Sequence, residues 1–403
     1  MPAITPKIDT PKSSPQATSA APSLGELFAG FLRLGATAFG GPAMVAYIRQ
    51  LAVDRKGWLN ARAFDDGVAL CQAVPGATAM QTAAYVGLSV RGVAGAAVSF
   101  VGFGLPAFGL MLMLAGIYAR THNLPGVVSA FSGLQTIVVA MVANAAVAFG
   151  QTALHRWQHG VISAVAVALF GWGINPFLVV VLAAGLGFWL LKAEVSTASI
   201  EAIAPPMPQT RKPALLILFA AATFLTVLFF THRRLYELAT LMVRVDLFAF
   251  GGGFASVPLL FNEIVSVRHW LDSPTLSDGI VLGQVTPGPI VITATFVGYL
   301  LYGPFGAVVA TLGVFLPSFL ILIAAAPHFD RLRASPVFAR LIGGALCSFP
   351  GLLLIVTFHF AQSVSWNPAR LLLAGAAFVA LRLGANIFWV VVIGAGFAMI
   401  FCR

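Results

Sequence analysis

The stretch DGVALCQAVPGA (66–77) recurs as DGIVLGQVTPGP (278–289), 212 residues further along the chain. Each copy places a glutamine, followed three residues later by a Pro-Gly pair, between long apolar runs. Proline has no amide hydrogen and ends a helix, yet it fits the first turn of the next one. Each copy of the stretch therefore predicts a helix that is interrupted within apolar surroundings.

A second repeated stretch precedes the first in each half. FLRLGATAFGGP (31–42) matches MVRVDLFAFGGG (242–253) at an offset of 211 residues, which makes Arg33 equivalent to Arg244. Three further dipeptides match at nearly the same offset: Trp58-Leu59 with Trp270-Leu271, Val86-Gly87 with Val297-Gly298, and Leu105-Pro106 with Leu316-Pro317. So many matches at one offset indicate an internal duplication.

The composition identifies the solvent of this chain. Of 403 residues, 59% are hydrophobic and only 9% are charged, whereas a soluble domain carries about 25% charged residues. This composition excludes a cytosolic enzyme or a secreted disulfide scaffold and predicts an all-α polytopic membrane protein in a lipid bilayer. Apolar segments that are candidates for spans lie at 92–118, 125–150, 160–174, 176–191, 214–231, 304–326, 337–360 and 371–402.

Charge and ligand chemistry exclude further classes. The net charge is +10, but the basic residues sit singly between apolar runs, as the positive-inside rule predicts, so we expect no nucleic-acid partner. The three cysteines and seven histidines show no metal-ligand spacing. No cluster of His, Asp or Glu suggests an enzyme, so we predict no catalytic residue, no metal and no cofactor.

The polar stretches divide the chain. We predict a disordered cytoplasmic tail at 1–23, a first repeat at 24–191 and a polar linker at 192–213. A connecting transmembrane helix at 214–231 then leads to a second repeat at 232–403. The segment 371–402 is expected to be a helical pair broken near Arg382.

Loop charges predict how the halves are oriented. The loop 49–62 has four basic residues and one acidic one, a net of +3, while its counterpart 261–272 has one basic and two acidic, a net of −1. Opposite charge predicts opposite sides of the membrane, and thus inverted repeats. The Gly/Pro-interrupted segments 24–48 and 64–90 would then be re-entrant hairpins. Arg233 and Arg234 favour the alternative, parallel halves.

Broken helices in inverted repeats often hold the substrate of a transporter near the midplane. A helix that starts at such a break points free amide hydrogens and its positive dipole end at it, which favours an anion. The predicted site residues are Gly40, Gly41, Gln72, Pro75, Gly76, Gly251, Gly252, Gln284, Pro287 and Gly288, together with Arg33 and Arg244. The alternatives are helix kinks for the glycines and prolines, and snorkelling for the arginines.

Three aspartates are candidates for coupling. Asp246 stands where the first half has Gly35; it is an ion-pair partner for Arg244, a protonatable coupling group, or an interfacial residue without a role. Asp66 and Asp278 each precede a glutamine by six residues. We expect both to cap helix N-termini, with gating or coupling as the alternative.

With both pairs of motifs in hand, the chain resembles the chromate ion transporter (CHR) family, in its long form with two homologous halves. The family's Gly-Gly-Pro and Gln-x-x-Pro-Gly-Pro motifs correspond to 39–42, 72–76, 250–253 and 284–289. The resemblance implies export of chromate, an oxyanion similar to sulfate, across a bacterial inner membrane. Transport of another anion, such as sulfate or an organic anion, is the alternative. The oligomeric state is open, with a homodimer among the options.

Overall fold

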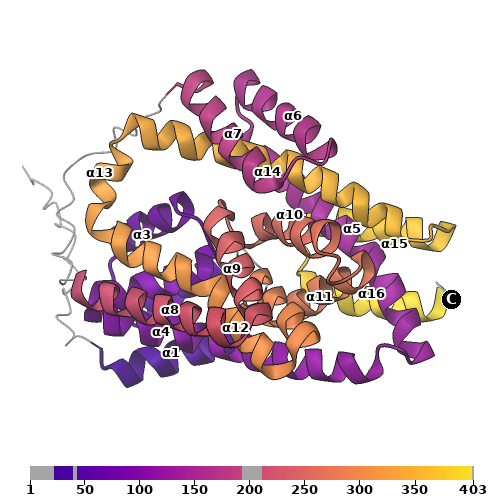
Figure 1. Cartoon of the computed structure of the whole chain (residues 1–403), viewed down its shortest axis with the longest axis horizontal. Coiled ribbons are helices and arrows are strands. Elements are labelled where there is room, and N and C mark those ends of the chain that lie inside the picture. Colours follow the sequence, from indigo (N-terminus) through magenta and orange to yellow (C-terminus); the bar gives the residue numbers. More distant parts are fainter. Residues whose placement is uncertain (1–21, 40–42, 193–210, 402–403) are drawn as a thin grey trace, which may run out of the picture.

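The computed structural model describes residues 22–39, 43–192 and 211–401, and every regular element within these ranges is helical (Figure 1). Gly40 and Gly41, most of the predicted tail and most of the predicted linker lie outside them. Five helices in these ranges are long and apolar enough to cross a membrane. The chain is therefore an all-helical, multi-span membrane protein.

The first half contains seven α-helices and one π-helical turn. Their bounds are α1 Leu24–Thr37, α2 Ala43–Arg49, η1 Gln50–Arg55, α3 Ala61–Ala73, α4 Thr78–Thr121, α5 Pro125–Ala153, α6 Trp157–Gly171 and α7 Pro176–Leu190.

The second half repeats this order after α8. The bounds are α8 Arg211–Thr231, α9 Arg233–Phe248, η2 Gly253–Ala255, α10 Ser256–Phe261, η3 Asn262–Val267, α11 Ser273–Val285, η4 Ile290–Ile292, α12 Thr293–Ala325, η5 Ala326–His328, α13 Phe329–Arg333, α14 Pro336–Ser363, α15 Pro368–Arg382 and α16 Ile387–Phe401. The predicted break near Arg382 is present, since α15 ends there.

Both Pro-Gly elements interrupt a helix, as predicted. Helix α3 ends at Ala73 and α4 begins at Thr78. The chain reverses between them, because a Cβ placed on Gly67 would lie 2.1 Å from the ring of Tyr85. In the second half Gly279 faces Phe296 in the same way, at 2.4 Å. Each Pro-Gly element is thus the tip of a helical hairpin.

Helices α4 and α12 each consist of two legs joined by a sharp kink. Gly92 and Gly303 have nearly the same positive φ, 64° and 65°. The first leg of each helix completes the hairpin. The second leg, at 93–121 and at 304–325, folds back against the first, because Gly87 is in backbone contact with Gly95 and Gly298 with Gly306. At 1.5 Å per residue, the 29-residue leg of α4 is about 43 Å long, enough to cross a bilayer, whereas α3 extends only about 20 Å.

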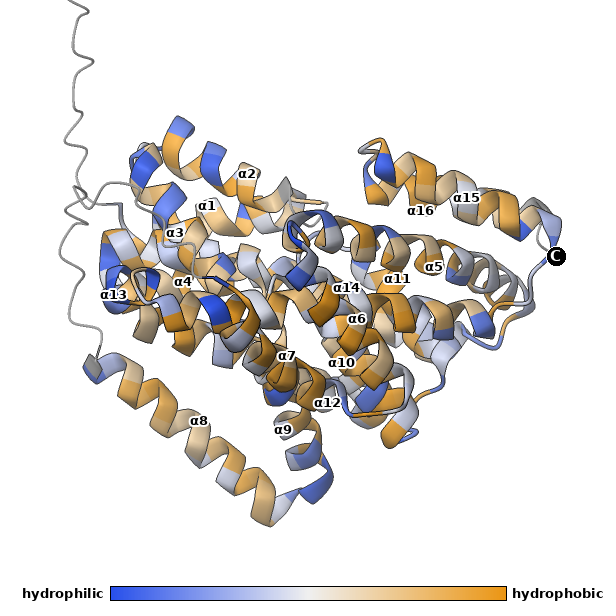
Figure 2. Cartoon of the chain, turned by 90° about the horizontal axis from the view of Figure 1, so that it is seen from above, coloured by the Kyte–Doolittle hydropathy of each residue, from blue (hydrophilic) through white to orange (hydrophobic). Residues whose placement is uncertain are grey.

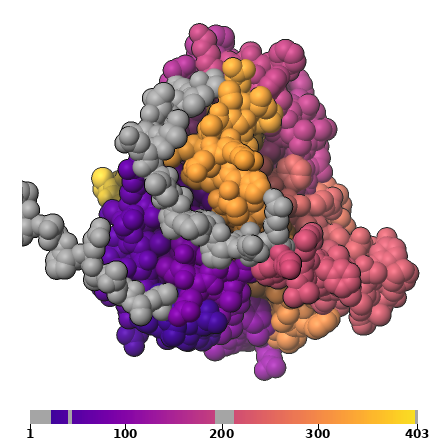
Figure 3. Space-filling view, turned by 90° about the vertical axis from the view of Figure 1, so that its left-hand side faces the viewer, coloured from indigo at the N-terminus to yellow at the C-terminus, as the bar shows by residue number. Residues whose placement is uncertain are grey.

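The two long legs run in opposite directions between the hairpins. The α4 leg starts at the first hairpin, and near its end Tyr118 donates a hydrogen bond to Asp278 of the second hairpin, 2.7 Å away. The α12 leg starts at the second hairpin, and beyond its end Arg333 donates to Asp66 of the first, at 3.3 Å. The two halves are therefore interleaved, and the orange surface of the second half lies against the purple surface of the first (Figure 3).

Helix α8, which connects the halves, lies along one edge of the molecule (Figure 2). Leu216 and Phe219 on it are 71% and 72% exposed. Such large apolar side chains, left uncovered along 21 residues, suit contact with lipid. Its residues include the segment 214–231 for which a connecting helix is predicted.

The expectation that Asp66 and Asp278 cap helices is wrong. Asn60 caps α3 and Asp272 caps α11, each accepting a hydrogen bond from the amide three residues on. Both helices start earlier than the repeated motif suggested, because a suitable cap precedes the motif in each half. The aspartates lie inside the helices, and their side chains are free for other contacts.

Candidate functional site

The helix ends of α1, α3, α9 and α11, two from each half, meet inside the molecule. The amide of Gly76 donates to the carbonyl oxygen of Ala249, 2.9 Å away, and the amide of Gly288 donates to the carbonyl oxygen of Ala38, at 3.2 Å. Because these positions are equivalent, the two bonds relate the halves by an approximate two-fold axis. Gly253 lies against Ile290 and completes the cluster.

Glycine is required at both Pro-Gly tips. Gly76 and Gly288 have φ of +114° and +121°, a backbone region that side chains disfavour. Space is also lacking: a Cβ on Gly76 would lie 2.2 Å from the Cβ of Ser318, and one on Gly288 would lie 2.6 Å from that of Ala107. Each tip is thus pressed against the long leg of the other half.

The helices that start at these tips lack side-chain caps. Ala77 at the start of α4 and Pro289 at the start of η4 make no capping hydrogen bond through a side chain. The first amides of a helix have no partner within it, and together they carry a partial positive charge. Both tips therefore present the end of a helix that suits an anion.

A polar cluster surrounds only one of the two tips. Asp246 is 1% exposed and accepts a hydrogen bond from the amide of Ser318, at 2.7 Å. Gln81 donates to the carbonyl oxygen of Pro75, at 2.7 Å. Asp246 Oδ1 and Gln81 Oε1 are shielded from solvent and accept no hydrogen bond from the described residues. Oδ1 points at Gly76, lying 3.1 Å from where its Cβ would be.

The equivalent place at the other tip lacks a carboxyl group. Gly35 and Ala107 stand where Asp246 and Ser318 stand, at an offset of 211 residues, and Gln81 corresponds to Ile292 or Thr293 according to the offset used. The approximate symmetry of the backbone is therefore broken by chemistry: one tip has a buried carboxyl group beside it and the other has none.

The two predicted arginines have different surroundings. Arg244 lies 3.7 Å from the carboxylate of Glu263, which is also 3.2 Å from Arg268. The Glu263 side chain is only 4% exposed. Arg244 therefore pairs with Glu263 and not with Asp246. The side chain of Arg33 makes no ion pair or hydrogen bond within the part of the chain that the structure describes.

Glu263 is a residue that sequence reasoning missed. In the first half its position is apolar, Leu51 or Ala52 according to the offset used. The same departure from the repeat that singled out Asp246 would have identified it.

A cavity of about 310 Å³ lies beside the first break, between α1 and the α2–η1 segment. It is lined by two basic side chains and several polar ones, and none of the lining residues is acidic: Gly30, Arg33, Leu34, Thr37, Ala38, Tyr47, Gln50, Leu51 and Arg55. This volume holds several water molecules or a small oxyanion. Because Ala38 bonds to Gly288, the cavity reaches the cluster of tips.

The two predicted glutamines also differ. Gln284 is 8% exposed, and its Nε2 is shielded from solvent and donates to no acceptor among the described residues. Gln72 is exposed on α3. Gly251 and Gly252 lie at the break that receives Gly76, with Gly252 against Thr78. Pro75 and Pro287 both lie within the interruptions.

The other two aspartates tie elements together. Asp278 accepts hydrogen bonds from Tyr118 and from Gln135, the latter at 3.0 Å, and Asp66 pairs with Arg333. No group of three or more His, Cys, Asp or Glu within the described ranges is arranged to hold a metal ion.

Comparison with known proteins extends over both halves. The chromate transporter family matches residues 25–188 and 236–400. An uncharacterized transporter of Methanocaldococcus jannaschii is 40% identical over 92% of this chain and 93% of its own length. The chromate transport proteins of Pseudomonas aeruginosa and Cupriavidus metallidurans are both 31% identical, over 96% and 85% of this chain and 95% and 84% of their own lengths. No solved structure matches the chain.

Proposed function

Because the chain belongs to the chromate transporter family, we propose that it exports chromate or a closely similar oxyanion across a bacterial inner membrane. It is a transporter and not an enzyme. The observation that carries the proposal is the meeting of four helix interruptions, at which two uncapped helix starts converge. Transport of another anion, such as sulfate, is the second candidate, since the relative with 40% identity is uncharacterized.

We propose that the halves are inverted repeats and that their hairpins are re-entrant. The opposite directions of the α4 and α12 legs support this arrangement. So does the short length of α3, about 20 Å against a hydrocarbon core of about 30 Å. The hairpins would then enter from opposite faces, and their tips would meet near the midplane, where transporters hold substrate.

The substrate in this proposal approaches through the cavity beside Arg33. Arg33 and Arg55 supply positive charge there without a competing carboxylate among the lining residues. A guanidinium presents paired donors that match the oxygens of an oxyanion. The anion would then reach the tips, where backbone amides and the Nε2 of Gln284 are the donors. Arg244, already paired with Glu263, would hold the second hairpin in place.

Asp246 is the coupling group in this proposal. Asp246 is 1% exposed, and its unpartnered carboxylate oxygen faces Gly76. Protonation of this carboxylate would therefore remove a buried charge next to the substrate site. Exchange of a proton for the oxyanion would couple proton entry to oxyanion export. Without such coupling, the membrane potential supplies about 2.3 kcal/mol per charge per 100 mV, which also drives a divalent anion out.

Uptake of labelled chromate into everted membrane vesicles tests the function. We expect uptake that depends on the protein and that sulfate inhibits. An absence of chromate uptake together with saturable sulfate uptake would replace chromate with sulfate as substrate. An absence of both would refute the oxyanion proposal.

A further inference from the structure

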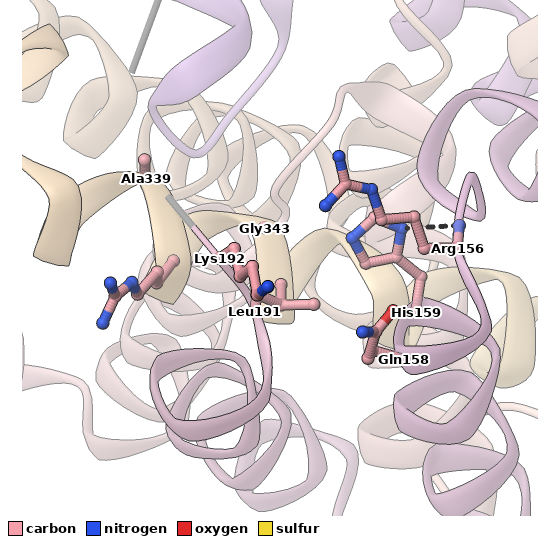
Figure 4. A pocket seen from close by; sticks show the side chains of 8 residues that line it. Arg156, Gln158, His159, Leu191, Lys192, Ala339 and Gly343 are labelled. Carbon is pink, nitrogen blue, oxygen red and sulfur yellow. Dashed lines mark hydrogen bonds between the residues drawn. The ribbon is translucent and has the colours of Figure 1, made fainter. Parts of the chain in front are cut away.

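A second basic cavity lies away from the helix interruptions. It has a volume of about 170 Å³ and lies where the start of α6, the end of α7 and the first turns of α14 come together. Arg156, Gln158 and His159 line one side, and Leu191 and Lys192 lie across from them beside α14 (Figure 4). Arg340, Ala339 and Gly343 complete the lining.

The cavity results from a close helix crossing. Gly187 of α7 and Gly344 of α14 are in backbone contact, because a Cβ on Gly187 would lie 2.5 Å from the Cα of Gly344. Beyond this crossing α7 ends at Leu190, and the space next to the first turns of α14 is left open. Long basic side chains surround that space without filling it.

The lining defines the chemistry of an occupant. Three of the eight residues are arginine or lysine, one is histidine and none is acidic. The Nε of Arg340 is shielded from solvent and donates to no acceptor among the described residues, and the Oε1 of Gln158 accepts no hydrogen bond from them. An occupant that satisfies both needs an anionic oxygen for the arginine and a hydroxyl or amine hydrogen for the glutamine.

Two tryptophans place the cavity at the surface of the bilayer. Trp157, between two lining residues, is 73% exposed, and Trp189, two residues before Leu191, is 81% exposed. Tryptophan is enriched at the level of the lipid headgroups. Exposed Val161 and Leu190 provide an apolar surface next to it, on which acyl chains can lie.

We propose that this cavity binds the phosphate of an anionic phospholipid whose headgroup carries a hydroxyl, such as phosphatidylglycerol. Basic pockets between transmembrane helices bind such headgroups through charge. The phosphate lies between Arg156, Lys192 and Arg340, and the headgroup hydroxyl donates to Gln158. The bound lipid fastens the α6–α7 pair to α14.

Native mass spectrometry of the full-length protein tests the site. The protein is titrated in detergent with phosphatidylglycerol, and with phosphatidylcholine for comparison. Lys192→Gln and Arg340→Gln each remove one charge from the cavity. Arg331→Gln removes the same charge from an exposed position on α13 and is the matched control. We expect each cavity variant to bind phosphatidylglycerol about fivefold more weakly, with no change for the control or for phosphatidylcholine.

Phosphatidylmethanol has the same charge as phosphatidylglycerol but no headgroup hydroxyl, so it tests the role of Gln158. Wild-type protein should prefer phosphatidylglycerol, and Gln158→Leu should bind both lipids equally. Binding by both charge variants equal to that of wild type refutes the site. If inorganic phosphate alone displaces the lipid, and Arg340→Gln weakens this effect of phosphate, the cavity is a site for a free anion and the lipid assignment is overturned. Thermal melting identifies a variant that has not folded. If Arg340→Gln does not fold, lipid binding by Lys192→Gln decides the outcome, because Lys192 is exposed after the end of α7.

Discussion

At the scale of single residues, the two halves differ at a few positions near the helix interruptions. The backbone of each half is nearly the same, yet Arg244 has Glu263 as a partner and Arg33 has none among the described residues. Likewise Asp246 replaces Gly35. These few substitutions leave one tip with a buried carboxyl group and one half with an arginine that has no acidic partner among the described residues.

Arg33→Ala is expected to reduce chromate uptake by everted vesicles by about tenfold or more. In the proposed site it removes a charged hydrogen-bond donor to the oxyanion, worth about 1.5–3 kcal/mol. Arg244→Ala is the matched variant. It leaves Glu263 with Arg268 alone and should lower the melting temperature more than it lowers uptake. Equal loss of uptake in both variants, at equal protein level, would contradict the distinction.

Asp246→Asn is expected to retain chromate exchange at equilibrium and to lose acceleration by an acidic vesicle interior. Asparagine can still accept the hydrogen bond from the Ser318 amide but cannot bind and release a proton. Asp278→Asn is the comparison, because both oxygens of Asp278 are hydrogen-bonded and its loss should affect stability instead. Tracer exchange and gradient-driven uptake measured in parallel separate the two effects. An undiminished response to the pH gradient in Asp246→Asn would rule out this carboxyl as the coupling group.

At the scale of elements, the helix interruptions contain two glycines at which any side chain would be strained. The Pro-Gly motif predicts where the helix stops, but the reason for glycine is the opposing helix leg, at Ser318 for Gly76 and at Ala107 for Gly288. The element therefore serves both as a break and as a contact between halves.

Gly76→Ala and Gly288→Ala are each expected to destabilise the protein by about 2–4 kcal/mol, from a disfavoured φ and an overpacked contact. Gly173 is the matched control: its φ is +81° and nothing lies within 4 Å of an added Cβ. Thermal melting in detergent should separate the cost of φ, which all three share, from that of the contact. Similar melting temperatures for all three variants would show that the tips are not tightly packed.

At the scale of the whole molecule, the arrangement of the halves relative to the membrane determines the mechanism. If the halves are inverted, Asp54 in the basic loop and Val267 in its acidic counterpart lie on opposite sides. We expect cysteines placed at these two positions, with Cys402 replaced by serine, to differ in their reaction with an impermeant maleimide. One should react in intact cells and the other in everted vesicles. The native Cys71 and Cys347 are buried. Arg331→Cys should react in the same preparation as Asp54→Cys. Reaction of Asp54→Cys and Val267→Cys from the same side of the membrane would mean that the halves are parallel.

Local chemistry explains why much of the fold could be predicted from the sequence. A Pro-Gly pair preceded by glutamine and repeated in both halves favours a helix break, so the breaks near Pro75 and Pro287 were predictable, whereas Pro106, Pro317 and Pro350 lie inside continuous helices. The long apolar runs likewise predicted the helices. Helix starts were less predictable: Asn60 and Asp272 cap α3 and α11, while the repeated motif drew attention to Asp66 and Asp278. Capping depends on a few atoms at one turn, and several residues nearby had the right chemistry.

The sequence by itself determined the lipid environment, the duplication, the helix interruptions and the family, because composition, periodicity and motif are properties of neighbours along the chain. Only the tertiary structure decided which interruptions meet, that Arg244 is paired while Arg33 is not, and that Gln284 is buried while Gln72 is exposed. These facts depend on the packing of segments far apart in sequence. Equivalent residues of the two halves have different partners in the folded protein, because the halves contact each other through side chains that differ between them.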